Sequence, residues 1–526
     1  MSASRSFLPV LPASRRFVAT VAAIVNNTPP SKTTKAGQNE VEQTPAIPAP
    51  PPQVKPFGAI PSPGFFGNLV AILRSGIRLS HLVDFERHQK FGPIVRVHMG
   101  DMVACQVSAP HLIEEVLRNE GKYPKRFEII PWKEYREKRG LSYGLLTAEG
   151  EEWHRNRNIL SKRMLRPKHV SSYTGILNDV SLDLVSRFRD IRDENQKIPK
   201  IDNELYKWAF ESVCSVLFET RMGCLGNKVP ADTQKFIAAI TQMFVSQGWL
   251  FVLPLALHRN LKSKPYTRHM EAWDTIFDVA TRLVQTKIKS IFKEDELGNN
   301  KDTNEEHEAE FLTYILSTQK LSLEEIIGNI TEILLAGVDT TSNTMMWALY
   351  ELVTNPDCLN RLVDEVDTVL KGKELTQEQL PQMKYMKCVI KETLRKYPVL
   401  TASARVLEKD IVLSGFHIPK HTVIGTMYYV MGRDPKLFDD PKSFRPERWL
   451  RSPNNNLPDG FSSIPFGFGP RMCIGNESHC SMYLIICVTI LQNFHIEAFS
   501  HERLQGCFRG VLTPESPIPV RFIDRS

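Results

Sequence analysis

The stretch Phe466–Gly475 constrains this chain more than any other, because it holds one cysteine, Cys473, in a glycine-rich loop. The glycines of the stretch are Gly467, Gly469 and Gly475. Glycine adopts backbone angles that other residues avoid, so we expect the chain to fold tightly around the sulfur and to direct backbone N–H groups at it. The apolar run Tyr483–Ile490 predicts a helix whose N-terminus adds partial positive charge nearby. Both features favour a thiolate.

Arg471 lies two residues before this cysteine and can pair with a carboxylate. A thiolate beside a cation suits an iron porphyrin, because the metal accepts sulfur as an axial ligand and the propionates need guanidinium partners. The pattern F-x-x-G-x-R-x-C-x-G resembles the haem-binding signature of the cytochrome P450 family and is matched at every fixed position. The resemblance implies a mainly α-helical fold with a small β-sheet region, and haem b with Cys473 as the axial ligand of its iron.

The chain departs from the family's usual pattern directly after this loop. The family usually continues with two arginines, a variable residue, a small residue and a glutamate. The corresponding residues here are Asn476, Glu477, Ser478, His479 and Cys480. Both basic positions are lost, and His479 replaces a small side chain that is expected against the porphyrin. A degenerate haem-binding protein without enzymatic activity therefore stays open as an alternative.

The composition indicates one large domain behind a leader. The 526 residues show no internal repeat and one strong break in composition. Of the formal charge of +7, five units come from residues 1–39, which contain no acid, so residues 40–526 carry only +2. A nearly neutral body gives no reason to expect a nucleic-acid partner.

The acid-free leader resembles a mitochondrial transit peptide, because it combines arginine and serine with a short apolar run at residues 17–25. That run has nine residues, whereas a bilayer core needs about twenty, so we predict no transmembrane helix. We assign residues 1–44 to a transit peptide and disordered leader, residues 45–63 to a proline-rich linker, and residues 64–526 to the haem-thiolate domain. An endoplasmic-reticulum protein fed by a flavoprotein reductase is the alternative.

The nine cysteines are an odd number and show no framework spacing. We expect them to be reduced thiols in a reducing compartment. Cys480 and Cys487 follow Cys473 at intervals of seven residues, which is typical of helical core packing. The spacing of cysteine and histidine suggests no zinc site.

Two local patterns predict how the chain begins its fold. The alternating stretches Val95–Met99 and Val103–Val107 predict an antiparallel hairpin that turns at Gly100-Asp101. Trp153 and Arg157, four residues apart, share one face of a predicted helix. The resemblance implies that this pair lies at the haem edge and binds a propionate.

The predicted helix Leu321–Asn355 carries the second informative motif. Gly337 inside a helix costs about 1 kcal/mol relative to alanine, and a flat ligand against the helix would give a reason for it. Thr340 can hydrogen-bond to a carbonyl one turn earlier, and Asp339 offers a route for protons. The motif resembles the oxygen-activation motif of the family, which implies catalytic roles for Asp339 and Thr340.

Glu392 and Arg395 share a helical face three residues apart and can pair. The resemblance implies that this pair is buried and joined by Arg448 in a structural triad. Arg405 stands where the family places another propionate ligand, so the cofactor-binding set implied by the resemblance has five members. They are Trp153, Arg157, Arg405, Arg471 and Cys473.

The stretch Glu120–Arg126 and the leader resemble the mitochondrial, ferredoxin-dependent branch of the family. Lys387 and Lys391, four residues apart, match the basic pair on which that branch docks its ferredoxin. The apolar segment Trp249–Leu257 is suited either to peripheral contact with a membrane or to burial in the core. Residues 293–310 hold eight acids and predict a solvated loop.

These patterns together predict a haem-thiolate monooxygenase at the matrix face of the mitochondrial inner membrane. It would insert one oxygen atom from O2 into an apolar small molecule, with electrons from a small ferredoxin. Sterols, secosteroids, fatty acids and xenobiotics suit such a pocket equally, so the substrate stays open.

Overall fold

The computed structural model describes residues 54–99, 102–166, 172–251, 253–296, 311–451 and 457–525. The chain divides into two units, Met1–Gln53 and Val54–Ser526. The predicted leader, residues 45–53 of the predicted linker, the hairpin turn at Gly100-Asp101 and most of the predicted acidic loop lie outside the described residues. The helices and strands of the described residues lie within Val54–Ser526.

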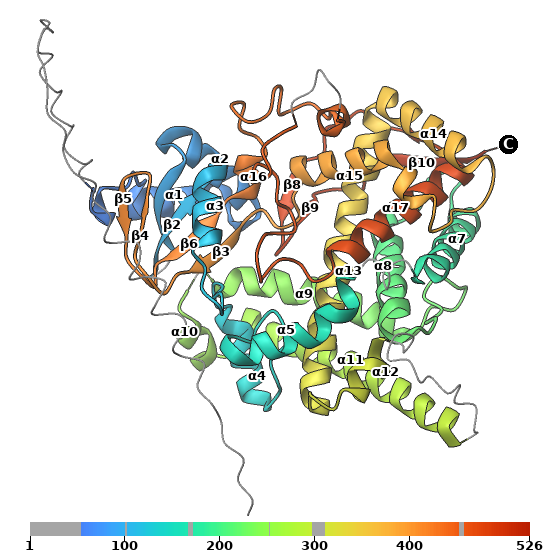
Figure 1. Ribbon diagram of the computed structural model, residues 1–526, viewed down its shortest axis with the longest axis horizontal. Helices are drawn as coiled ribbons and strands as arrows, with labels where there is room; N and C mark the ends of the chain where they lie inside the picture. Colours follow the sequence, from blue (N-terminus) through green and yellow to red (C-terminus); the bar gives the residue numbers. More distant parts are fainter. Residues whose placement is uncertain are drawn as a thin grey trace, which may run out of the picture. The chain divides into compact units, whose positions relative to one another are not determined.

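The secondary structure confirms the predicted class, mainly helical with small sheets (Figure 1). The helices are α1 (Gly64–Ser75), α2 (Ser80–Phe91), α3 (Pro110–Arg118), α4 (Ile130–Arg139), α5 (Gly150–Met164), α7 (Thr174–Ile191), α8 (Ile201–Phe218), α9 (Ala231–Leu250), α10 (Leu255–Asn260), α11 (Lys264–Glu296), α12 (Phe311–Ser317), α13 (Leu323–Thr354), α14 (Pro356–Leu370), α15 (Lys384–Lys396), α16 (Tyr428–Met431) and α17 (Asn476–Asn493). The strands are β1 (Ile94–Met99), β2 (Met102–Val107), β3 (Ser403–Val406), β4 (Ile411–Leu413), β5 (Phe416–Ile418), β6 (Val423–Thr426), β7 (Phe494–Ala498), β8 (Gly506–Phe508), β9 (Leu512–Pro514) and β10 (Val520–Asp524). Short 3-10 helices are η1 (Phe57–Ala59), η2 (Ile77–Leu79), η3 (Leu380–Gln382) and η4 (Pro446–Trp449).

The largest sheet has the strand order β1-β2-β6-β3. β1 and β2 pair antiparallel, with Val95 opposite Gln106, so the predicted hairpin is confirmed. β6 lies parallel to β2 and antiparallel to β3. Alternate residues of these strands, such as Cys105 and Ile424, are buried in a core of their own, which fixes the register of the sheet. β3 carries Arg405, whose side chain is buried.

Helix α13 forms the centre of the helical core and confirms the predicted helix at residues 321–355. It begins at a capping box in which Ser322 and Glu325 bond reciprocally to each other's backbone N–H groups. Residues on every side of the helix are buried, as expected of a helix surrounded by others. α8 packs along α13, and α17 contacts both α13 and α7.

The structure brings the three residues of the predicted triad together. Glu392 lies 2.7 Å from Arg395 and 3.0 Å from Arg448, and all three side chains are almost fully buried. Trp449 also donates to the Glu392 carboxylate, at 2.9 Å. Burial opposes ionisation, but the hydrogen bonds and charges of the two arginines keep the pKa of Glu392 below its ordinary value. The triad ties α15 to η4, the segment that leads toward the cysteine loop.

A second buried ion pair was not predicted from the sequence. Arg136 of α4 donates to Glu332 of α13 at 2.7 Å, and both side chains are fully buried. Glu332 also accepts from the backbone N–H of Leu146, at 2.6 Å, and from the Thr147 hydroxyl. The pair therefore holds the segment between α4 and α5 against α13.

All nine cysteines are free thiols in the described part of the chain. Cys487 is 1% exposed, which confirms its predicted role in packing. No helix among the described residues combines the length and the apolar character needed to cross a bilayer.

Candidate functional site

The loop around Cys473 is folded by two of its three glycines. Gly467 and Gly469 have φ angles of 75° and 77°, a region that favours glycine. Gly475 has an ordinary φ of −94°, so the prediction that its backbone angles require glycine was wrong. Glycine is needed there for space, because a Cβ atom would lie 2.8 Å from Cε1 of His479.

The Cys473 sulfur lies just before the N-terminus of α17. That helix begins at Asn476, seven residues earlier than the apolar run Tyr483–Ile490 predicted. Burial raises the pKa of the Cys473 thiol, while the Gly475 N–H and the charges of Arg126 and Arg157 lower it. The protein groups alone therefore offset only part of the free-energy cost of a buried thiolate. A metal cation bound to the sulfur would offset the rest.

Two predicted propionate ligands are tied to the protein. Arg405 forms a buried ion pair with Glu120. The Arg471 guanidinium donates to three backbone carbonyl oxygens, those of Pro124 (2.9 Å), Leu145 (3.3 Å) and Ala148 (3.1 Å). It also lies 3.9 Å from the ring centre of Trp153, which is buried. Arg471 thus fastens the segments before and after α4 to the cysteine loop.

Arg157 and Arg126 have guanidinium groups without a carboxylate partner among the described residues. Arg126 donates to the Arg471 carbonyl at 2.6 Å, and its buried Nε has no partner. Burial and the neighbouring charges of Arg405 and Arg157 lower the pKa of Arg126 to about 10. Burial also lowers the pKa of Arg157. From the sequence, Arg126 served only as a sign of the family branch, and its place in the site was not predicted.

The α13 motif has the predicted local geometry. The Thr340 hydroxyl donates to the Ala336 carbonyl one turn earlier, at 2.7 Å. Asp339 accepts from Tyr206 of α8 through Oδ1, whereas its buried Oδ2 has no partner. Burial raises the pKa of Asp339 to about 6, against the opposing hydrogen bond from Tyr206. Asp339 can therefore gain and lose a proton near neutral pH.

A mainly apolar cavity of about 80 Å³ separates α13 from the cysteine loop. Cys473, Gly475 and His479 line one side of it, and Ile333, Ala336 and Gly337 line the other. Gly337 therefore faces the cavity, as expected of a helix that presents a flat surface to a ligand. Burial lowers the pKa of His479 to about 4, so its imidazole is neutral at physiological pH.

A family model described as "Cytochrome P450" matches residues 60–522. The chain belongs to the cytochrome P450 family. The predicted family, haem-thiolate cofactor and enzyme class are thereby confirmed, whereas the roles of individual site residues stay predictions. The match begins within the predicted linker, and the bounds of the three predicted segments also stay predictions.

Three relatives show where this P450 stands in the family. It is 36% identical to "Cytochrome P450 27C1" of Danio rerio, over 90% of this chain and 88% of the relative. It is 37% identical to "25-hydroxyvitamin D-1 alpha hydroxylase, mitochondrial" of Homo sapiens, over 88% and 91% of the two chains. It is 34% identical to "Sterol 26-hydroxylase, mitochondrial" of Rattus norvegicus, over 90% of each chain.

The residues around the cavity fit a haem in all respects but one. Four arginines lie close enough to affect one another's ionisation: Arg126, Arg157, Arg405 and Arg471. Glu120 pairs with one of them, so the cluster keeps an excess of positive charge that two propionates would neutralise. The thiol suits the metal and the apolar lining suits the porphyrin ring, although a cavity of about 80 Å³ must widen before it can hold a porphyrin. The exception is His479, whose ring lies in the space between the two walls.

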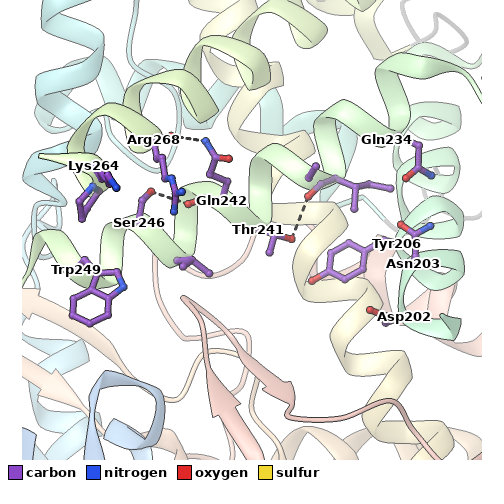
Figure 2. A pocket seen from close by; sticks show the side chains of 14 residues that line it. Asp202, Asn203, Tyr206, Gln234, Thr241, Gln242, Ser246, Trp249, Lys264 and Arg268 are labelled. Carbon is purple, nitrogen blue, oxygen red and sulfur yellow. Dashed lines mark hydrogen bonds between the residues drawn. The ribbon is translucent and has the colours of Figure 1, made fainter.

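A larger hollow of this P450, of about 620 Å³, lies along α9 between α8 and α11 (Figure 2). It shares no lining residue with the cavity at Cys473. It does share Asp202, Tyr206 and Thr241 with a neighbouring hollow of about 180 Å³ that reaches Asp339. Figure 2 shows Tyr206 and Asp202 side by side at one end of the larger hollow. The two hollows are thus neighbours on the side of α8, and the smaller one is lined by Asp339.

The predicted docking lysines lie on the outer side of α15, near the start of α17. Burial and the charge of Glu477 raise the pKa of Cys480 to about 12, against the opposing charges of Lys391 and Lys387. The charges of all three side chains therefore act on one thiol. Glu477 and Lys391 are exposed. An acid is thus part of the same surface as the two lysines.

Proposed function

We propose that this P450 is a mitochondrial monooxygenase that inserts one oxygen atom from O2 into a sterol, a secosteroid or a similar apolar molecule, with electrons from a ferredoxin. The observation that carries the proposal is the apolar cavity with Cys473 on one wall and Gly337 of α13 on the other. Relatives named as mitochondrial hydroxylases of sterols and vitamin D support the compartment and the substrate class. They disfavour the endoplasmic-reticulum alternative.

Each wall of the cavity has a distinct role. Haem bound there supplies the chemistry that activates O2. Cys473 would hold the iron, and Arg126 and Arg157 would bind the propionates, since both have donors to spare. Arg471 contacts the Trp153 ring and a loop carbonyl, and Arg405 pairs with Glu120. These three side chains would therefore fix the wall of the cavity, and the two arginines would place positive charge near the propionates.

Protons would reach the site through α13. The Ala336 carbonyl accepts from the Thr340 hydroxyl, and such back-bonding often bends a helix, which would leave room for water beside it. Asp339 lies next to it and faces the polar hollow on the side of α8. Tyr206 holds one carboxylate oxygen and leaves the other free for water. Asp339 would pass protons from that water toward Thr340.

Exposed apolar side chains support a peripheral contact with the membrane. Four side chains of the segment Trp249–Leu257 are between 44% and 59% exposed: Trp249, Phe251, Leu253 and Leu257. The alternative that this segment is buried in the core is wrong for these four. In α1, Phe66 and Leu73 each expose more than three quarters of their surface to solvent. Large exposed apolar side chains on short helices suit insertion into the surface of a bilayer.

The experiment is reconstitution of the purified protein with each class of electron donor. One set of assays contains a ferredoxin and its reductase, and the other contains the flavoprotein reductase of the endoplasmic reticulum. A panel of sterols and secosteroids is screened for hydroxylated products by mass spectrometry. We expect products with the ferredoxin only. Products with the flavoprotein alone, or none with any donor while haem is bound, would contradict the proposal.

A further inference from the structure

The imidazole of His479 bridges the two walls of the haem cavity. A Cβ atom at Gly475 would lie 2.8 Å from its Cε1 and 2.9 Å from its Nδ1. A Cβ atom at Gly337 of α13 would lie 3.8 Å from its Nε2. One edge of the ring therefore touches the cysteine loop, and the opposite edge reaches the helix across the cavity.

The same two glycines mark the space that a flat porphyrin needs. Glycine at position 475 leaves room for the His479 ring, whereas a Cβ atom at Gly337 would first meet Val213 of α8, at 3.0 Å. Both glycines line the gap between the cysteine loop and α13, as Cys473 does. In this structure the imidazole takes up part of that gap and lines the cavity of about 80 Å³ that remains. The porphyrin and this orientation of His479 cannot occupy it together, since two atoms cannot approach within van der Waals contact without strain.

Little holds the ring in its place. Its nitrogen atoms form no hydrogen bond with another described residue, and its aromatic neighbour, Tyr483, lies parallel at 6.3 Å between ring centres. The ring can therefore turn aside when haem enters, but it must then be packed elsewhere in a core that is already filled. Such overpacking usually weakens the state that requires it by about tenfold or more in an equilibrium constant.

We propose that His479 weakens the retention of haem, because its imidazole competes with the porphyrin for the space between Gly475 and Gly337. This inference rests on the haem site of the proposed function. A small side chain at position 479 would leave the gap between Gly475 and Gly337 open, whereas the imidazole of His479 narrows it.

The test measures haem loss from the purified holoprotein to an excess of apomyoglobin, followed by absorbance. We expect His479→Ala to release haem about tenfold more slowly than the wild type. His479→Phe, with a larger ring, should release it faster. Cys480→Ala is the matched control, because it removes the next side chain of α17, which does not line the cavity, and it should release haem at the wild-type rate.

The outcomes separate the two claims. Equal or faster loss from His479→Ala, with an unchanged circular dichroism spectrum and the thiolate-type carbon monoxide spectrum, would overturn the role of His479 alone. If the alanine variant does not fold, His479→Ser is measured instead, with the same expectation. Failure of the wild type and of every variant to bind haem would overturn the proposed function.

Discussion

Asp339 illustrates how a single residue gains its role from its surroundings. Its two carboxylate oxygens differ, because Oδ1 accepts from Tyr206 and Oδ2 is left without a protein partner. Burial favours the neutral form and raises its pKa to about 6. Asp339 is thus protonated at acid pH and mostly ionised at pH 8. A proton donor with such a pKa operates in the physiological range.

The pH dependence of coupling tests this role. Because the protonated fraction of Asp339 falls above pH 6, we expect product formed per electron consumed to fall as the pH rises from 6 to 8. Asp339→Asn should give a low ratio that no longer changes over this range. The ratio is measured from hydroxylated product and NADPH consumption. A wild-type ratio in Asp339→Asn would show that protons take another route.

Tyr206 should set the midpoint of that dependence. Its hydrogen bond lowers the pKa of Asp339, so Tyr206→Phe should shift the midpoint of the coupling profile to higher pH. Tyr266→Phe is a suitable control, because that hydroxyl bonds to Glu134 on α4 and not to α13. An unchanged midpoint in Tyr206→Phe would mean that Asp339 is not the group that titrates.

At the scale of elements, two buried ion-pair clusters join helices that are far apart in the sequence. The triad at Glu392 joins α15 to η4, and the pair of Arg136 and Glu332 joins α4 to α13. The triad was predictable because two of its members lie three residues apart on one helical face. The Arg136–Glu332 pair was not, since its partners are distant in sequence and neither carries a local pattern that distinguishes it from a surface charge.

Breaking the triad should be far more costly than breaking a surface pair. Glu392→Gln would leave two buried guanidinium groups without a carboxylate, so we expect a loss of about 3–5 kcal/mol in the free energy of unfolding. Asp439→Asn removes the exposed partner of Arg445 and should change it by less than about 1 kcal/mol. Urea unfolding followed by circular dichroism measures both, and equal effects would contradict the structural role of the triad.

The start of α17 shows what a hydrophobic pattern cannot reveal. The prediction began at Tyr483, where continuous apolar residues begin, but the helix starts at Asn476. Its first turn is polar and follows directly from Gly475. Helix ends depend on such local caps and on tertiary contacts, whereas the centre of α13 was predictable from its long apolar pattern. The contacts of His479 with two glycines required the structure, because Gly337 lies on a different helix.

At the scale of the whole molecule, recognition of a ferredoxin should depend on net charge near the cysteine loop. Lys387 and Lys391 would attract an acidic partner, and Glu477 would repel it. Electron-transfer contacts are small, so single charges should matter and salt should weaken them. We expect Lys391→Gln to raise the ferredoxin concentration needed for half-maximal reduction and Glu477→Arg to lower it. Stopped-flow reduction at low and high salt measures this. The control is Lys420→Gln, an exposed lysine just after β5, a strand that lies well away from α15 in Figure 1.

The proposed activity depends above all on Cys473 as the ligand of a haem. The most direct test is the difference spectrum of the reduced protein with and without carbon monoxide, recorded for wild type, Cys473→Ala and Cys480→Ala. We predict a thiolate-type spectrum for the wild type and for Cys480→Ala, and its loss in Cys473→Ala. A thiolate-type spectrum that survives in Cys473→Ala would contradict the assignment of this cysteine and, with it, the haem site between α13 and the cysteine loop.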